Sequence, residues 1–309
     1  MTRISMYAAL ASVLTLTLAS TANAGLADGL IVLYEFENSG NLGENSASGN
    51  AGTNVDVAQV AGGQIGNAGD WAAINDAFGA RLLVNSADLS NIQFGGTGTG
   101  DGSISVSLWM KNTGNPTISS TNASATYPTA YDGSAGGGGW RSINNNYVPG
   151  NQDGNLQLNI NSIGGGSTSA NYSPVGDSDP SFSLHDDAWH HVAYTLERAS
   201  NVTTVTLFAD GVKLIGPSGE NPAVSAEQAN GFPLGQWVIG SDSEGNVGVR
   251  LTGKLDDYAI WNRTLSDAEI TGIYDNGLLG QGIIPEPSSM LLALWGLVGL
   301  ASYRSRRTC

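Results

Sequence analysis

The chain has 309 residues, of which 27 are acidic and 12 basic, giving a formal net charge of −15 at pH 7. Such an acidic chain repels phosphate groups, so we expect no nucleic-acid partner. The only cysteine is the final residue, Cys309, which excludes a fold held together by disulfide bonds. The 43 glycines and the low charged fraction of 13% are typical of an all-β protein with many turns.

The first 24 residues have the organisation of a secretory signal peptide. Arg3 supplies a positive start, Met6 to Leu18 form an apolar core, and Ala22-Asn23-Ala24 is a small-x-small cleavage site. We predict cleavage between Ala24 and Gly25, and therefore export. Without the two end segments, 8 basic and 26 acidic residues remain, which suits an extracellular protein.

The first half of the body contains two strand patterns and one segment without a period. In residues 29–38 and 103–111, successive side chains alternate between two faces of a predicted strand. In the second run Ile104, Val106, Leu108 and Met110 share one face, which predicts a half-buried antiparallel strand. Residues 112–150 are rich in glycine, serine and asparagine, and we predict a long loop insertion there.

The second half of the body reads as a series of strands. Alternating runs predict strands at 155–162, 191–196, 203–209, 212–215 and from 236 onward. Asp210-Gly211 is a two-residue signal for a type I′ hairpin turn, because both positions need positive φ.

The body closes with a strand at 253–261 and one short helix at 267–275. Ser266 and Glu269 form a capping box at the start of the helix. We expect Ile270, Ile273 and Tyr274 to pack against the sheet, and Asn276-Gly277 to end the helix. Many short strands that each bury one face predict an all-β, two-sheet antiparallel sandwich.

Five stretches in this order resemble the laminin-G-like jelly roll of the concanavalin A-like lectin/glucanase group: LIVLYEFEN, ISVSLWMK, AWHHVAYTLE, VTLFADGVKL and GKLDDYAIWNRTLSDAEITGIYDNG. The resemblance covers residues 25–280, which we predict to be one domain. It implies a jelly roll of a kind that often binds carbohydrate, protein or calcium at a rim of loops. It does not imply catalysis, because fold is not function.

Five oxygen-bearing residues are candidate ligands of a structural calcium ion: Asp28, Glu44, Asn45, Asp256 and Asp257. Calcium takes six or more oxygens from carboxylates and carbonyls. Similar loops in some members of the resembled family contribute such ligands, as the loop carrying Glu44 and Asn45 would here. In the alternative interpretation, Asp256 bonds only to backbone amides.

We predict no catalytic residues. A retaining glucanase needs two carboxylates about 5–5.5 Å apart, and the nearest sequence pattern, Glu35-Phe36-Glu37, lies in the first predicted strand. The adjacent His190 and His191 point to opposite faces of a strand, so they cannot bind one metal ion together.

Three aromatic residues in the glycine-rich segment are candidates for stacking on sugar rings: Tyr131, Trp140 and Tyr147. Packing within the loop is the alternative interpretation for Trp140. We interpret Trp109, Trp189, Trp237 and Trp261 as structural residues of strands.

Residues 281–309 have the organisation of a sorting tail. Pro285-Glu286-Pro287 precedes an uncharged, apolar segment at 288–303, and a cluster of Arg304, Arg306 and Arg307 follows. The segment is near the lower length limit for a membrane helix, and the arginines would remain in the cytoplasm.

The tail resembles the PEP-CTERM sorting signal of Gram-negative bacteria. This resemblance implies an exosortase-type enzyme as a partner and a chain that contacts the membrane through its tail before processing. We expect a protein secreted across the inner membrane to the cell surface or matrix, where it binds extracellular polysaccharide without catalysis. The alternatives are a protein-binding adhesin or structural matrix component, and a glycoside hydrolase.

Overall fold

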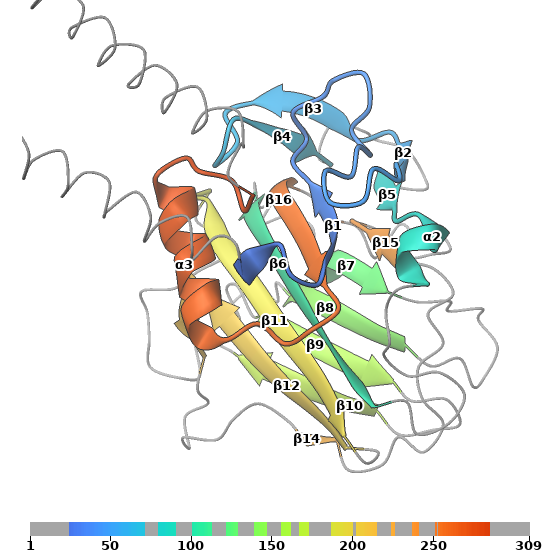
Figure 1. Cartoon of the computed structure of the whole chain (residues 1–309), viewed down its shortest axis with the longest axis vertical. Helices are drawn as coiled ribbons and strands as arrows, with labels where there is room; N and C mark the ends of the chain where they lie inside the picture. The colour runs from blue at the N-terminus through green and yellow to red at the C-terminus, as the bar shows by residue number, and fades with distance from the viewer. Residues whose placement is uncertain are drawn as a thin grey trace, which may run out of the picture.

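A computed structural model of the chain describes residues 25–71, 80–90, 101–112, 122–128, 139–146, 156–161, 167–172, 187–199, 202–214, 224–225, 237–240, 251 and 253–284. These residues form two antiparallel β-sheets stacked face to face, with a helix across the outer side of one sheet (Figure 1). The predicted all-β sandwich with a short C-terminal helix is confirmed.

The first sheet is built from strands of both halves of the chain. Its strands are β1 (Leu30–Tyr34), β3 (Ala58–Ala61), β4 (Asn67–Asp70), β6 (Gly102–Asn112), β11 (His190–Ala199), β12 (Val202–Ala209), β13 (Val212–Lys213), β14 (Val224–Ser225) and β16 (Gly253–Trp261). The order is β13-β12-β11-β6-β16-β4-β3, with β1 also paired to β16 and β14 to β12. The first and last strands of the domain are therefore neighbours.

Five of the seven strands described in the second sheet were not predicted from the sequence, and two of these five lie within the predicted loop insertion. Its strands are β2 (Thr53–Val55), β5 (Arg81–Leu83), β7 (Asn122–Pro128), β8 (Gly139–Asn146), β9 (Leu156–Asn161), β10 (Ser167–Tyr172) and β15 (Trp237–Ile239), in the order β10-β9-β8-β7-β15-β5-β2. Strands β7 and β8 lie within 112–150, so the prediction of loop over that whole segment was wrong. Backbone hydrogen bonds pair β7 with β15 and β8, and β8 with β9.

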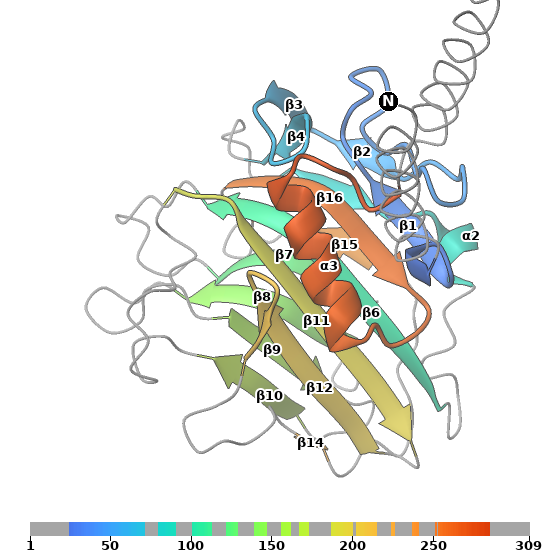
Figure 2. The ribbon, with the colours of Figure 1, turned by 60° about the vertical axis from the view of Figure 1, so that its left-hand side comes forward.

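Helix α3 (Asp267–Leu278) crosses the outer face of the first sheet, over β11 and β6 (Figure 2). Its capping box is confirmed, since Ser266 and Glu269 bond each other's backbone amides. The predicted stop at Asn276-Gly277 was wrong, because the helix continues to Leu278. A second, four-residue helix, α2 (Ser86–Leu89), was not predicted.

Strand β6 of the first sheet is buried on both faces, and this corrects the half-buried strand predicted at 103–111. Ile104, Val106 and Leu108 face the second sheet in the larger apolar cluster. On the opposite face Ser105 and Ser107 have 0% exposure. Ser105 bonds the backbone of Arg263 and Leu265, just before α3, and Ser107 bonds His191. A smaller apolar cluster fills that outer layer: Leu26, Leu33, Ala193, Phe208, Ala259, Trp261, Leu265, Ile270, Ile273 and Ile283.

The hairpin turn at Asp210-Gly211 is confirmed, with φ of 48° and 73°. Neither α2 nor α3, within the part of the chain that is described, is long and apolar enough to cross a membrane.

Candidate functional site

The candidate site lies where β1 and β16 both leave regular strand geometry. The register pairs Leu33 with Ala259 and Tyr34 with Tyr258, so its continuation places Glu35 opposite Asp257. Strand β1 ends at Tyr34, four residues before the predicted end at Asn38. Phe36 and Asp257 have φ of 58° and 43°, in the left-handed region that costs a residue with a side chain free energy.

Four carboxylates gather at this junction: Glu35, Glu37, Asp256 and Asp257. Burial is the main cause that raises the pKa of Asp257 well above its ordinary value, and the charges of Asp256, Glu35 and Glu37 raise it further. Burial also raises the pKa of Asp256 to about 7, although the amides of Ile65 and Asp257 oppose the shift. None of the ion pairs found among the described residues includes any of these four groups.

Asp256 and Glu37 hold the turn that joins β3 to β4. The side chain of Asp256 accepts hydrogen bonds from the amides of Ile65 at 2.8 Å and Asp257 at 3.0 Å. Glu37 accepts bonds from the amide and the side chain of Asn67, at 2.8 and 2.7 Å. The alternative interpretation of Asp256, as a backbone-bonding residue, therefore describes its contacts.

Glu35 lines an open hollow beside this turn. The hydroxyl of Ser46 donates a hydrogen bond to Oε2 of Glu35. The hollow has a volume of about 430 Å³, and polar side chains line most of it: Glu35, Glu37, Asn38, Asn41, Glu44 and Ser46.

The structure does not bring the five predicted calcium ligands together. Asn45 is buried, and its amide already bonds Ile31, Leu33, Ala47 and the side chains of Ser48 and Asp88. Glu44 is exposed and accepts a 2.7 Å bond from Asn38. Asp28 uses its carbonyl to bind Arg263. Among the described residues, no three His, Cys, Asp or Glu side chains are grouped closely enough to hold a metal ion.

The two adjacent histidines make separate contacts, as predicted. Nδ1 of His190 lies 2.9 Å from Oδ2 of Asp210, whereas Nε2 of His191 lies 2.8 Å from the hydroxyl of Ser107. Complete burial lowers the pKa of His191 to about 4, although the charge of Asp210 opposes the shift. The side chain of His191 packs against Trp109, with ring centres 5.3 Å apart.

Only one of the three aromatic residues proposed to stack on sugars falls among the described residues. Trp140 lies in β8, paired with Ile160 of β9, and not in a loop as predicted. Tyr131 and Tyr147 lie outside the described residues, as do residues 1–24 and 285–309 of the predicted export and sorting segments. Trp109, Trp237 and Trp261 are buried in strands, which confirms their structural interpretation. Trp189 is half-buried and precedes β11.

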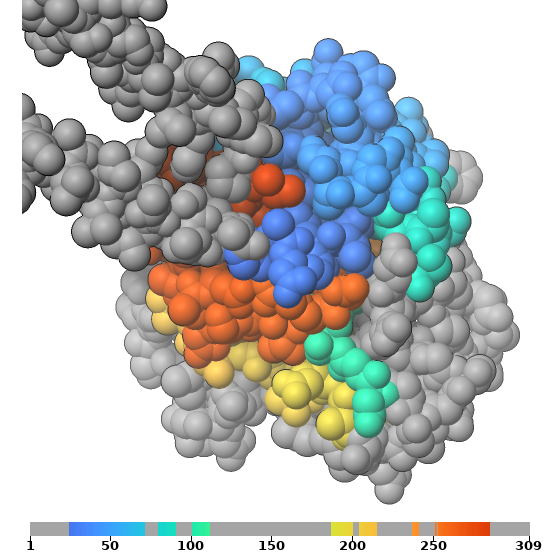
Figure 3. All heavy atoms as spheres, viewed as in Figure 1, coloured from blue at the N-terminus to red at the C-terminus, as the bar shows by residue number. Residues whose placement is uncertain are grey.

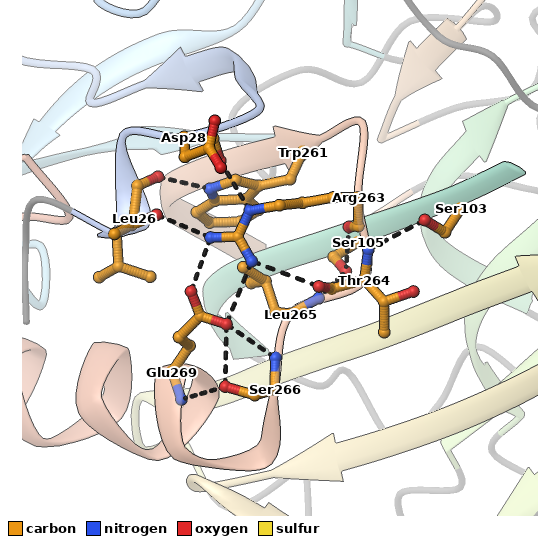
Figure 4. Close-up of polar contacts among 11 residues, drawn as sticks. Leu26, Asp28, Ser103, Ser105, Trp261, Arg263, Thr264, Leu265, Ser266 and Glu269 are labelled. Atoms are coloured by element: carbon orange, nitrogen blue, oxygen red, sulfur yellow. Dashed lines mark hydrogen bonds and ion pairs between the residues drawn. The ribbon is translucent and has the colours of Figure 1, made fainter.

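A second polar cluster fastens the N-terminal segment to the end of the domain (Figure 4). Arg263 pairs with both carboxylate oxygens of Glu269, at 2.6 and 3.1 Å. The same guanidinium donates to the carbonyls of Gly25 at 2.7 Å and Asp28 at 2.8 Å. Figure 3 shows the N-terminal residues and α3 side by side on this face.

The two stacked antiparallel sheets, with the first and last strands paired, define a β-sandwich. The family model described as the concanavalin A-like lectin/glucanases superfamily, Laminin_G_3, matches residues 85–271, more than half of the chain. The chain belongs to this superfamily, which includes both binding proteins and enzymes.

Several solved structures are similar to this one, at low sequence identity and with TM-scores under 0.5. Domain 4 of AbnA, a GH43 extracellular arabinanase from Geobacillus stearothermophilus solved with arabinotriose, is 18% identical with a TM-score of 0.46, over 79% of this chain and 97% of that one. The receptor-binding domain of a botulinum neurotoxin C/D mosaic serotype is 16% identical with a TM-score of 0.49, over 81% and 51%.

The binding domain of botulinum neurotoxin DC, solved with SialylT, is 11% identical with a TM-score of 0.46, over 82% of this chain and 52% of that one. The chain therefore spans about half the length of the toxin domains it matches. These likenesses concern the fold alone. No curated protein matches the sequence.

Proposed function

We propose that the chain is an exported, non-catalytic protein that binds extracellular carbohydrate through its jelly roll. The observation that carries this proposal is membership of the lectin/glucanase superfamily over residues 85–271. An acidic body without cysteine in the domain suits an extracellular setting.

The contacts of the four carboxylates at the strand junction favour binding over hydrolysis at that place. A glycosidase needs one carboxylic acid that can protonate the leaving group and a second carboxylate that can reach the sugar. Asp256 and Asp257 are 0% and 2% exposed, and Glu37 is bonded to Asn67. Asp256 and Asp257 are therefore too buried to reach a sugar. Glu37 is exposed, but both of its carboxylate oxygens accept hydrogen bonds from Asn67.

A glycan array with the purified full-length chain tests the carbohydrate partner. We expect binding to a polysaccharide class, and weaker binding after Trp140→Ala, because Trp140 is the described candidate for stacking on sugar rings. Leu279→Ser is the matched control, because Leu279 is 72% exposed at the end of α3, remote in sequence from β8. Absence of binding to every glycan, combined with capture of a surface protein, would favour the adhesin alternative.

We also propose that both end segments are processed during export. The described strands and helices, from Leu30 to Leu278, lie within the interval between the predicted signal peptide and Pro285. An exosortase-type enzyme would recognise Pro285-Glu286-Pro287 and act on the chain while the 288–303 segment lies in the membrane.

Mass spectrometry of the protein recovered from its own cells tests this processing. We expect an N-terminus at Gly25 and a chain that lacks Arg304, Arg306 and Arg307. A mature periplasmic protein that still carries residues 304–309 would contradict sorting and leave the glycan proposal untouched.

A further inference from the structure

The predicted first residue of the mature chain lies beside the carboxylate of Glu269. A Cβ atom placed on Gly25 would lie 3.8 Å from Oε1 of Glu269. The nitrogen and the Cβ position of one residue are about 2.5 Å apart, so the nitrogen of Gly25 lies at most about 6.3 Å from this oxygen. Small rotations about the bonds of Gly25 and of the Glu269 side chain bring two such atoms into contact.

The oxygen of Glu269 that faces Gly25 has room for one more donor. Oε2 accepts bonds from Nη1 of Arg263 at 3.1 Å and from the amide and the hydroxyl of Ser266, both at 2.9 Å. Oε1 accepts one bond from the described residues, from Nη2 of Arg263 at 2.6 Å. A carboxylate oxygen has two lone pairs, so one acceptor position of Oε1 is open to a further donor.

The backbone around Gly25 is already held in place. Leu26 is 3% exposed, and its carbonyl accepts a 2.7 Å bond from the indole of Trp261. The carbonyl of Gly25 accepts bonds from Arg263 at 2.7 Å and from the amide of Asp28 at 3.2 Å. Because these contacts order the segment, a charge on the nitrogen of Gly25 would lose little further conformational entropy when it pairs.

Cleavage of the signal peptide changes the charge at this nitrogen. In the precursor it belongs to a neutral peptide bond between Ala24 and Gly25. Hydrolysis of that bond leaves a carboxylate on Ala24, which departs with the signal peptide, and an amino group on Gly25. This amino group takes up a proton at neutral pH, because its ordinary pKa is about 7.7–8.0. The mature chain then presents an ammonium group beside Glu269.

The charges of the cluster favour such a group. Hydrogen bonds from Arg263 lower the pKa of Glu269 to about 2, so its carboxylate is ionised at neutral pH. Its side chain is half-buried, which limits screening by water. Figure 4 shows Arg263 and Glu269 together with Asp28, so the cluster holds one positive and two negative charges. An ammonium group on Gly25 would balance them.

We propose that Arg263 and Glu269 form a binding site for the amino terminus that cleavage creates at Gly25. Arg263 holds the carbonyl of Gly25, and Oε1 of Glu269 accepts from its ammonium group. This inference rests on the proposed cleavage between Ala24 and Gly25. The pair joins the first residue of the mature chain to α3, so the exported chain gains a stabilising contact that its precursor lacks.

The pH dependence of acylation of the α-amino group tests the site in the processed chain. Mass spectrometry first establishes that the chain begins at Gly25. We expect the pKa of the α-amino group to lie above its ordinary value, and Glu269→Gln to lower it. Glu44→Gln is the matched control, because it removes one negative charge from a carboxylate that bonds Asn38 instead. This control should leave the α-amino pKa unchanged.

The outcomes separate the inference from the processing proposal. A chain that begins at Gly25 with an ordinary α-amino pKa, or with a pKa lowered equally by both substitutions, would overturn the inference and leave the processing proposal standing. A mature chain that begins at another residue would contradict the processing proposal and the inference with it.

Acetylation of the amino terminus tests the pair without any substitution. At about pH 6.5 the reagent reacts with the α-amino group ahead of lysine, whose ordinary pKa is about 10.4. The acetylated parent loses the terminal charge and keeps every side chain, so we expect its melting temperature to fall by about 1–4 °C. Acetylation of Glu269→Gln should leave its melting temperature unchanged. An unchanged melting temperature of the acetylated parent, or an equal fall in Glu269→Gln, would refute the pair.

Discussion

The indole Nε1 of Trp237 donates a 2.9 Å hydrogen bond to the hydroxyl of Tyr258, and this bond joins the two sheets. Trp237 lies in β15 of the second sheet and Tyr258 in β16 of the first, and both are fully buried. Tyr258 pairs with Tyr34, the last residue of β1. The strand junction that carries the clustered carboxylates is thus anchored on its inner side to the opposite layer.

Replacing Tyr258 with phenylalanine tests this link. The substitution removes the acceptor and leaves a buried N–H group with one partner fewer, so we expect the free energy of unfolding to fall by about 1–3 kcal/mol. Urea denaturation measures the change. Tyr274→Phe is the matched control, because Tyr274 is half-buried and stacks on Trp109 through its ring. Equal losses in the two variants would contradict the importance of the bond.

Two glycines of α3 should respond in opposite ways to the same substitution. A Cβ on Gly277 would lie 2.4 Å from Cζ2 of Trp109, whereas a Cβ on Gly272 would meet nothing within 4 Å. We expect Gly277→Ala to destabilise the chain by about 1–3 kcal/mol and Gly272→Ala to stabilise it by up to about 1 kcal/mol. Thermal unfolding decides. A Gly277→Ala variant as stable as the parent would show that α3 does not pack closely against Trp109 at residue 277.

Burial of neutral His191 should make stability depend on pH. Its pKa in the folded chain is about 4, below the ordinary value of about 6.5. The unfolded chain therefore takes up a proton first as pH falls, and stability declines between about pH 6.5 and 4, by at most about 3 kcal/mol. His191→Gln should lose this component. An NMR titration that places the pKa of His191 near its ordinary value would refute the prediction.

Arg263 should be needed to hold the N-terminal segment. Arg263→Ala removes the bonds to Gly25, Asp28 and Glu269, and we expect a loss of about 2 kcal/mol in unfolding free energy. Arg263→Lys keeps the charge but not the planar fork, so it should recover only part of the loss. Urea denaturation and proteolysis near residue 25 are the measurements. Full recovery with lysine would show that charge alone suffices.

The ion pair between Arg263 and Glu269 should make the free energy of unfolding fall at low pH. Hydrogen bonds from Arg263 lower the pKa of Glu269 to about 2, against the smaller opposing effect of burial. A carboxylate with a lowered folded pKa stabilises the chain above its ordinary pKa, and that contribution is lost as pH falls from about 4.5 to 2. Glu269→Gln should lose this dependence while keeping the fold.

The alternation of apolar and polar residues along the sequence predicted the strands that bury an apolar face, because a period of two indicates which side chains are buried. Gly253 to Trp261 was predicted to the residue. Strand β8 was missed because its sequence carries no such pattern, and β7 was missed because its short alternation of Ala123, Ala125 and Tyr127 with polar residues lies in a segment rich in glycine, serine and asparagine. The extended end of α3 was missed because Gly277 serves a close approach to Trp109 and not a turn.

The candidate site could be predicted only in part for a related reason. Asp257 was named from its residue type and place in the closing strand. Its nearness to Glu35 depends on the pairing of β1 with β16, which no local sequence pattern indicates.

The central claim is that this jelly roll binds carbohydrate without cleaving it. The most direct test incubates the purified chain with polysaccharide from its own producing cells, and measures both the affinity and the polymer length. The expected result is saturable binding with the polymer length unchanged. Release of shorter sugars that stops in the Glu35→Gln or Glu37→Gln variant, or the absence of any binding, would contradict the claim.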